Sequence, residues 1–198
     1  MSENDISYSI EEKKRCDWPL DNDLMIHYHD TEWGVPLHDD KKLFESFLLD
    51  TFQAGLSWST ILNKRENFRR AFDNFQAKKI ARYKAKKISE LMKNAGIIRN
   101  QLKILSTIDN AKAFLEVQKE FGSFDKYIWK FVGGKPRKNK WKSMGDCPAK
   151  TQDSETMSKD LKQWGFRFVG PTICYAFMQG TGMVNDHAVH CFRYNEVS

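Results

Sequence analysis

Four side chains of the types that bind zinc lie near the two ends of the chain. They are Cys16 and His29 near the N-terminus, and His187 and Cys191 near the C-terminus. Two cysteines and two histidines suit a closed tetrahedral zinc site. The four-residue spacing of His187 and Cys191 fits one helical turn, whereas Cys16 and His29 require a loop that folds back. One bound ion would then join the two ends of the chain.

Spacing alone leaves other interpretations of these residues open. A buried cysteine is often a small apolar core residue, and zinc patterns with one long arm are weak. His190 lies beside Cys191 and is an alternative ligand to His187. Cys147 and Cys174 have no partner at metal-binding spacing, and Cys174 lies in an apolar segment that we expect in the core.

Length and composition favour one domain in a reducing compartment. The chain has 198 residues, of which 40% are hydrophobic and 13% aromatic, enough for a sizeable core. No run of 18 apolar residues exists, so we expect no membrane span. Residues 1–15 are polar and charged without an apolar signal segment, which predicts a cytoplasmic protein with reduced cysteines. We expect a loosely ordered extension over residues 1–14 and a single domain over residues 15–198.

Positive charge is concentrated in two blocks. Residues 1–50 carry 5 basic and 13 acidic side chains, whereas residues 64–103 carry 13 basic and 3 acidic ones. Residues 126–150 carry 8 basic side chains and 1 acidic one. Basic blocks in an otherwise acidic chain indicate a face that binds a polyanion. A solvated lysine-rich surface is the alternative.

The elements that must position these residues are helices, because hydrophobic residues recur at helical spacing along nearly the whole chain. We therefore expect an all-α fold. Asp39 and Asp40 can cap a helix that runs to about Ala54, and Pro171 can open one that ends near Gln179. The other expected helices span residues 58–63, 68–75, 80–83, 88–95, 99–121, 124–131 and 154–164. The long helix is expected to bury a stripe of Leu102, Leu105, Ile108, Ala111 and Leu115.

Two of these helices form a candidate DNA-binding hairpin. Residues 88–95 and 99–121 are joined by a short turn that begins with glycine. Such a turn leaves backbone N–H groups free at the start of the second helix, where they bind phosphate together with the helix dipole. The candidate phosphate-binding residues are Gly96, Ile98, Arg99 and Lys103. An ordinary αα-hairpin is the alternative.

Five longer motifs occur in order along the chain. They are HDTEWGVP at 29–36, QAGLSW at 53–58, NAGIIR at 94–99, FVGPT at 168–172 and VNDH at 184–187. Together they resemble 3-methyladenine DNA glycosylase I, the TAG type of the helix-hairpin-helix glycosylase superfamily. The resemblance extends over about residues 15–191. It implies that fold, with a structural zinc ion held by Cys16, His29, His187 and Cys191.

The resemblance also implies a function in base-excision repair. The expected enzyme is a monomeric, monofunctional DNA glycosylase, a hydrolase that removes 3-methyladenine from alkylated double-stranded DNA after flipping the base into an aromatic pocket. A base methylated at N3 carries positive charge, so it leaves the sugar as a neutral molecule and its glycosidic bond is weak. Such an enzyme relies less on a general acid than on a pocket that prefers a flat cation.

Aromatic residues in or next to the motifs are the candidates for this pocket. We expect Tyr28, Trp33 and Trp58 to line it, with core packing as the alternative for Trp33. The resemblance implies that Leu56, with Gln53 beside it, fills the gap that the extruded base leaves in the duplex.

Three positions near the expected pocket depart from the family pattern. Asp50 stands where the family has a glutamate, so the charge remains but the side chain is one methylene shorter. Met25 replaces a family tyrosine, and Phe52 stands where the family often has a polar residue. We expect Asp50 to be the catalytic carboxylate and Met25 to line the pocket; a surface position is the alternative for Asp50. The departures leave open a non-catalytic relative that binds damaged DNA, or an enzyme for another modified base.

Overall fold

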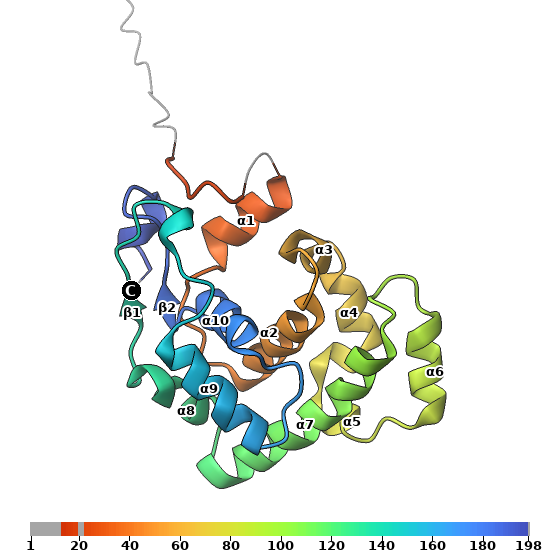
Figure 1. The fold of residues 1–198 in the computed structure, drawn as a ribbon. Coiled ribbons are helices and arrows are strands. Elements are labelled where there is room, and N and C mark those ends of the chain that lie inside the picture. Colours follow the sequence, from red (N-terminus) through yellow and green to blue (C-terminus); the bar gives the residue numbers. More distant parts are fainter. Residues whose placement is uncertain (1–12, 20–21, 198) are drawn as a thin grey trace, which may run out of the picture.

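The computed structural model describes residues 13–19 and 22–197 (Figure 1). Within them the fold is mostly helical, as the sequence predicts. Two strands of two residues each, β1 (Arg137–Lys138) and β2 (Val184–Asn185), pair in parallel. The expected extension over residues 1–14 lies outside the described residues, except for residues 13 and 14. No helix in the described part is long and apolar enough to cross a membrane.

Helix α1 was not expected from the sequence, and the other helices begin close to the residues that predict them. They are α1 (Asp23–Thr31), α2 (Asp40–Gln53), α3 (Trp58–Leu62), α4 (Arg65–Ala71), α5 (Ala77–Ile80), α6 (Ala85–Lys93), α7 (Gln101–Phe121), α8 (Phe124–Trp129), α9 (Gln152–Gln163) and α10 (Pro171–Gly180). The Asp39 carboxylate caps α2 by accepting a hydrogen bond of 2.8 Å from the amide of Lys42. Pro171 occupies the first turn of α10, where its missing N–H costs nothing.

Helix α2 lies at the centre of the main core and packs against α3, α7, α8 and α10 (Figure 1). Its residues Phe44, Leu48 and Phe52 have no exposed surface. A second, smaller cluster contains Cys16, Tyr28, Trp33, Leu62, Ala188 and Cys191. Trp58 packs against both clusters, so the start of α3 is where the main body and the joined chain ends meet.

The stripe expected on helix α7 is only partly buried, because Ala111 lies in the core and its first two leucines lie at the surface. Leu102 is 69% exposed and Leu105 is 37% exposed, whereas Ile104 and Phe114 are buried. The buried face also contains polar residues, such as Thr107, whose hydroxyl donates to the Ile104 carbonyl at 2.7 Å. A polar side chain that satisfies its hydrogen bond on its own helix can be buried, so hydrophobicity alone assigns the first turns of this helix to the wrong face.

Gly182 marks the closest approach of two backbone segments. It follows α10 with a φ of +68°, and a Cβ there would lie 2.3 Å from the carbonyl carbon of Val35 and 2.4 Å from the nitrogen of Pro36. Only glycine combines a left-handed backbone with this contact.

We therefore expect Gly182→Ala to lower the free energy of unfolding by about 3 kcal/mol, from the left-handed backbone and the clash together. Gly133→Ala is the matched control, because Gly133 has a φ of +71° but nothing within 4 Å of the added Cβ. The control should lose only about 1 kcal/mol. Urea denaturation of both variants measures the difference, and equal losses would contradict this account.

Candidate functional site

A pocket of about 190 Å³ lies where the two hydrophobic clusters meet. Its walls are Trp18, Met25, Tyr28, Trp33, Asp50, Gln53, Trp58, Met144, Ala176 and Gln179. The structure thus brings together all the residues that the sequence suggests for the base pocket, and Gln53 as well. Leu56 is not part of the wall; it is 41% exposed on the turn after α2.

Three helices each contribute two residues, and the members of each pair are three positions apart. The pairs are Met25 and Tyr28 on α1, Asp50 and Gln53 on α2, and Ala176 and Gln179 on α10. Residues at this spacing lie on the same helix face, so each helix presents one face to the pocket. Trp18, Met144, Ala176 and Gln179 were not expected in the pocket. Only Trp18 carries a signal, since it lies two residues after the candidate ligand Cys16.

Aromatic rings form most of the pocket wall. The ring centroids of Tyr28 and Trp58 are 5.2 Å apart, and those of Trp18 and Trp33 are 5.1 Å apart in an edge-to-face contact. Trp33 is 7% exposed and its ring also contacts His187 at 4.6 Å. Trp33 therefore belongs both to the pocket wall and to the buried cluster behind it, so the two interpretations of this residue are compatible.

Asp50 places an unpaired carboxyl group in this apolar wall. The residue is 4% exposed, and its Oδ2 accepts no hydrogen bond from the described residues. Burial raises the pKa of Asp50 well above its usual range, because the charged form is poorly solvated there. The indole Nε1 atoms of Trp18 and Trp58 also lack partners in the described part of the chain. Buried polar atoms normally have partners, so their gathering at one pocket indicates a ligand site.

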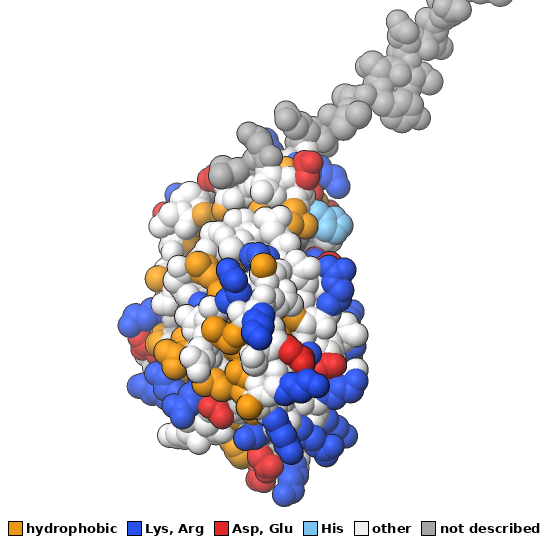
Figure 2. Space-filling view, turned by 90° about the vertical axis from the view of Figure 1, so that its right-hand side faces the viewer, with side chains coloured by type: hydrophobic (Ala, Val, Ile, Leu, Met, Phe, Trp, Pro, Cys, Tyr) orange, Lys and Arg blue, Asp and Glu red, His pale blue; other side chains and the backbone are white. Residues whose placement is uncertain are grey.

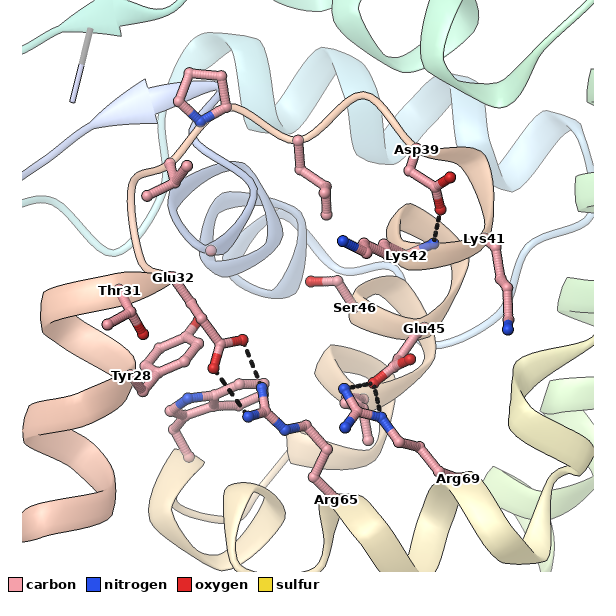
Figure 3. Close-up of a pocket in the computed structure, with 16 residues that line it drawn as sticks. Tyr28, Thr31, Glu32, Asp39, Lys41, Lys42, Glu45, Ser46, Arg65 and Arg69 are labelled. Carbon is pink, nitrogen blue, oxygen red and sulfur yellow. Dashed lines mark hydrogen bonds and ion pairs between the residues drawn. The ribbon is translucent and has the colours of Figure 1, made fainter.

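A larger hollow of about 700 Å³, drawn in Figure 3, shares two wall residues with the pocket. Tyr28 and Trp58 line both hollows and separate them. In the larger one, the Arg65 guanidinium lies 2.6 Å from the Glu32 carboxylate, and Arg69 pairs with Glu45 at 2.6 Å. These pairs brace α1 and α2 against α4 behind the aromatic wall, and their charges are already compensated.

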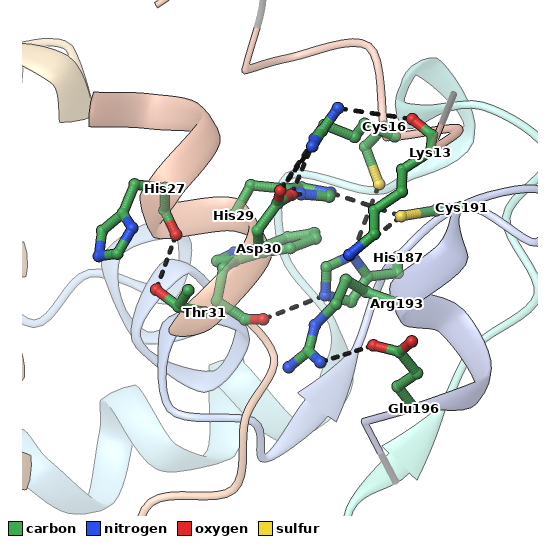
Figure 4. Close-up of polar contacts among 12 residues, drawn as sticks. Lys13, Cys16, His27, His29, Asp30, Thr31, His187, Cys191, Arg193 and Glu196 are labelled. Atoms are coloured by element: carbon green, nitrogen blue, oxygen red, sulfur yellow. Dashed lines mark hydrogen bonds and ion pairs between the residues drawn. The ribbon is translucent and has the colours of Figure 1, made fainter. Parts of the chain in front are cut away.

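Cys16, His29, His187 and Cys191 lie together in the smaller cluster, where all four are buried (Figure 4). One potential ligand atom from each lies within 4.8 Å of the others. The Cys191 Sγ is 3.5 Å from both His29 Nε2 and His187 Nδ1, and the Cys16 Sγ is 3.7 Å from His187 Nδ1. Ligands of a tetrahedral zinc ion are about 3.5 Å apart, so the donor set and its spacing fit zinc.

The surroundings of the cluster fix both histidine rings. His29 Nδ1 lies 2.7 Å from the Asp30 carboxylate, and His187 Nε2 lies 3.0 Å from the Trp33 carbonyl oxygen. Such partners orient the ligating nitrogen of a metal site. The contact between the two thiols lowers the pKa of Cys191 and raises the pKa of Cys16, so one of the two gives up its proton readily. The thiolate is the form of cysteine that binds metal.

The local structure at the ligands differs from the expectation. Helix α1 forms the second half of the segment from Cys16 to His29, where a loop was expected, and His187 and Cys191 lie on a non-helical turn and not on one turn of helix. That turn is closed by a bond of 2.8 Å from the Cys191 amide to the Ala188 carbonyl. His190 is exposed and lies outside the cluster, so the alternative ligand is excluded.

The hairpin between α6 and α7 has the expected order, but two of its groups are engaged within the protein. The Gly96 amide donates to Asn94 Oδ1 at 2.8 Å. Lys103 is buried, and its Nζ donates to the carbonyls of Phe52 at 2.8 Å and Ala54 at 2.6 Å. The Lys103 ammonium therefore closes the end of α2, where helix carbonyls lack partners, and the expected phosphate contacts of Gly96 and Lys103 are not supported.

The other two candidate phosphate-binding residues lie nearer the surface. Arg99 is exposed just before α7, and Ile98 is half-buried. In the described part of the chain, no acceptor is bonded to the amides of these two residues. Asn100 caps α7 by accepting from the Lys103 amide at 3.1 Å.

The buried carboxyl of Asp50 makes stability depend on pH. Because its pKa is raised in the folded state, the folded protein holds the Asp50 proton above the pH at which the unfolded chain releases it, about 4. The free energy of unfolding therefore falls as pH rises through the window between these two pKa values. Asp50→Asn should abolish this dependence and raise the unfolding free energy at pH 7 by about 1 kcal/mol.

Urea denaturation between pH 4 and pH 8 measures this effect. Asp109→Asn is the control, because the Asp109 side chain is 50% exposed and should leave the profile unchanged. Identical pH profiles for wild type and Asp50→Asn would show that Asp50 is not held in an unfavourable environment.

Known proteins share both this sequence and this fold. A profile of the methyladenine glycosylase family matches residues 18–194. DNA-3-methyladenine glycosylase 1 of Escherichia coli (strain K12) is 45% identical over 181 residues, which are 91% of this chain and 97% of that protein. A crystal structure of 3-methyladenine DNA glycosylase I (TAG) has a TM-score of 0.88 at 46% identity, over 90% of this chain and 98% of the other. A variant of 3-methyladenine DNA glycosylase I (TAG) in complex with 3-methyladenine has a TM-score of 0.87 at 34% identity, over 90% and 96%. This chain therefore belongs to the methyladenine glycosylase family.

Proposed function

We propose that this chain hydrolyses the N-glycosidic bond of 3-methyladenine in alkylated DNA. The observation that carries the proposal is a small aromatic pocket with one buried, unpartnered carboxyl oxygen on Asp50. Aromatic faces attract a flat cation, and a carboxylate complements its charge. Family membership supports the reaction, and the complex of a similar protein with 3-methyladenine supports the base.

In the proposed reaction the damaged nucleotide leaves the duplex and its base enters the pocket between Tyr28 and Trp58. A cationic base beside Asp50 favours the ionised carboxylate, which in turn stabilises the base in the pocket. A water oxygen then forms a bond to C1′ of the sugar while the bond from C1′ to the base breaks. The electron pair of that bond goes to the base, which leaves neutral, and the water proton passes to solvent. Because the leaving group is already cationic, no general acid has to protonate it.

We infer that double-stranded DNA binds across the turn after α2 and the α6–α7 hairpin. Leu56 is exposed on that turn, next to Gly55 with a φ of +77°, and is placed to fill the gap left by the base. The backbone amides of Ile98 and Arg99 are the candidate phosphate ligands. Lys and Arg side chains surround hydrophobic atoms on the face that carries α3, α4 and α6 (Figure 2), which suits a phosphate backbone.

We also infer that Cys16, His29, His187 and Cys191 hold one structural zinc ion. Its chemistry would be to join the two ends of the chain, with no part in bond cleavage. Because Trp33 contacts the His187 ring and also lines the pocket, the ion would fix one wall of the site. The same closure supports a single domain over residues 15–198, and a monomeric state stays a prediction. A cytoplasmic location remains a prediction.

The proposed activity is tested by release of bases from methylated duplex DNA, with each released base identified by chromatography. Wild type should release 3-methyladenine, and Asp50→Asn should lower that rate by on the order of 100-fold while DNA affinity changes little. Asp50→Glu restores the family residue. If Met25 and Phe52 shape the pocket around the shorter aspartate, this variant should release 3-methyladenine more slowly or release a different base. Release only by Asp50→Glu would instead favour a non-catalytic relative, and a different base released by wild type would favour a retuned enzyme.

The zinc proposal is tested by elemental analysis of protein purified without added metal. One zinc ion per chain should be found, and chelation should lower the melting temperature by about 10 °C, because a closed site contributes its binding energy to folding. Cys191→Ala should lose the metal, whereas Cys174→Ala should retain it, since Cys174 is equally buried but lies outside the cluster. The site would be refuted if wild-type protein contained no zinc and if a chelator left its melting temperature unchanged.

A further inference from the structure

Five hydrogen-bond donors converge on one buried carboxylate, Asp186, which is 1% exposed. The donors are Asn139 Nδ2 at 2.6 Å, Trp141 Nε1 at 2.8 Å, Tyr175 Oη at 2.6 Å, Gln179 Nε2 at 2.8 Å and the Cys147 thiol at 3.3 Å. They come from α10 and from the loop that contains β1, so Asp186 joins these elements next to the pocket. The reaction described above uses none of these bonds.

The hydrogen bonds around Asp186 determine which end of the Gln179 amide is left for the pocket. A carboxylate only accepts hydrogen bonds, so it must receive the NH₂ group of Gln179 and not its oxygen. The Cys147 sulfur, 3.3 Å from Gln179 Nε2, also accepts from this group. Gln179 lines the pocket, and in the described part of the chain its Oε1 accepts no hydrogen bond.

We propose that Gln179 is a specificity residue whose Oε1 accepts a hydrogen bond from the exocyclic amino group of the bound base, and that Asp186 is the residue that positions it. This inference rests on the proposed function. The amino group of adenine has two N–H bonds. Gln179 and Asp50 both line the pocket, and among the described residues no donor is bonded to Gln179 Oε1 or to Asp50 Oδ2, so two acceptors can receive those bonds.

The same arrangement discriminates against methylated guanine. Guanine carries the acceptor O6 where adenine carries its amino group. An oxygen of the base facing the oxygen of Gln179 would leave two buried acceptors without donors, which a polar site rejects strongly. Stacking on Tyr28 and Trp58 cannot supply this distinction, because every base has an aromatic face.

The test compares single-turnover release of 3-methyladenine and 3-methylguanine from the same methylated duplex. Gln179→Met keeps the length of the side chain and removes both polar ends. It should slow 3-methyladenine release about tenfold and raise 3-methylguanine release, because the acceptor that opposes O6 is gone, so the ratio of the two rates should fall by more than about tenfold. Gln163→Met, at the exposed last residue of α9, is the matched control and should keep the ratio of wild type.

The role of Asp186 is tested by Asp186→Asn. Its new NH₂ group would bond to the Gln179 oxygen, turn that amide around and present Nε2 to the pocket. The ratio should then fall below that of Gln179→Met, because a donor now favours O6 of guanine. Asn139→Ala removes a different donor from the same carboxylate and should leave the ratio unchanged.

Zinc content and melting temperature report whether each variant folds. Should Asp186→Asn not fold, Gln179→Met still decides the main claim. An unchanged ratio in Gln179→Met overturns the inference, and an unchanged ratio in a folded Asp186→Asn overturns the positioning role. Failure of wild type to release 3-methyladenine would instead refute the proposed function.

Discussion

The joining of the two chain ends is the constraint on which the pocket depends. Cys16 and His29 from one end lie against His187 and Cys191 from the other. Their closure places α1 beside α3, which brings Tyr28 against Trp58. Without this closure the main core of α2, α7 and α10 could still form, but one aromatic wall of the pocket would be missing.

The pocket is costly to keep in the empty protein. Among the described residues, Asp50 Oδ2 and two tryptophan N–H groups are buried without partners, and each such group reduces stability. A flat cation with polar edges removes this penalty when it enters. An acid that is destabilised as an anion until a cation arrives also distinguishes an alkylated base from the neutral bases of normal DNA. Selectivity and reduced stability therefore arise from the same atoms.

The sequence predicts the site better than it predicts the surfaces of the helices. Aromatic and acidic pocket residues lie in or near contiguous motifs, and the metal-type residues have distinctive chemistry, so both sets could be found. Met144 and Gln179 reach the pocket only through tertiary folding, and no local pattern marks them. Leu102 was expected in the core and Lys103 at the surface, because hydrophobicity and charge were taken as guides to burial. The structure reverses both, since the Lys103 ammonium finds carbonyl partners inside.

The reversed position of Lys103 has a mechanical consequence. Its backbone lies in the first turn of α7, next to the hairpin, while its ammonium bonds to the carbonyls of Phe52 and Ala54. These bonds connect the start of α7 to the end of α2, just before the turn that carries Leu56. If the hairpin holds a phosphate of the DNA backbone, Leu56 enters the duplex at a fixed number of nucleotides from that phosphate. The buried lysine would then determine which nucleotide is extruded relative to the bound phosphate.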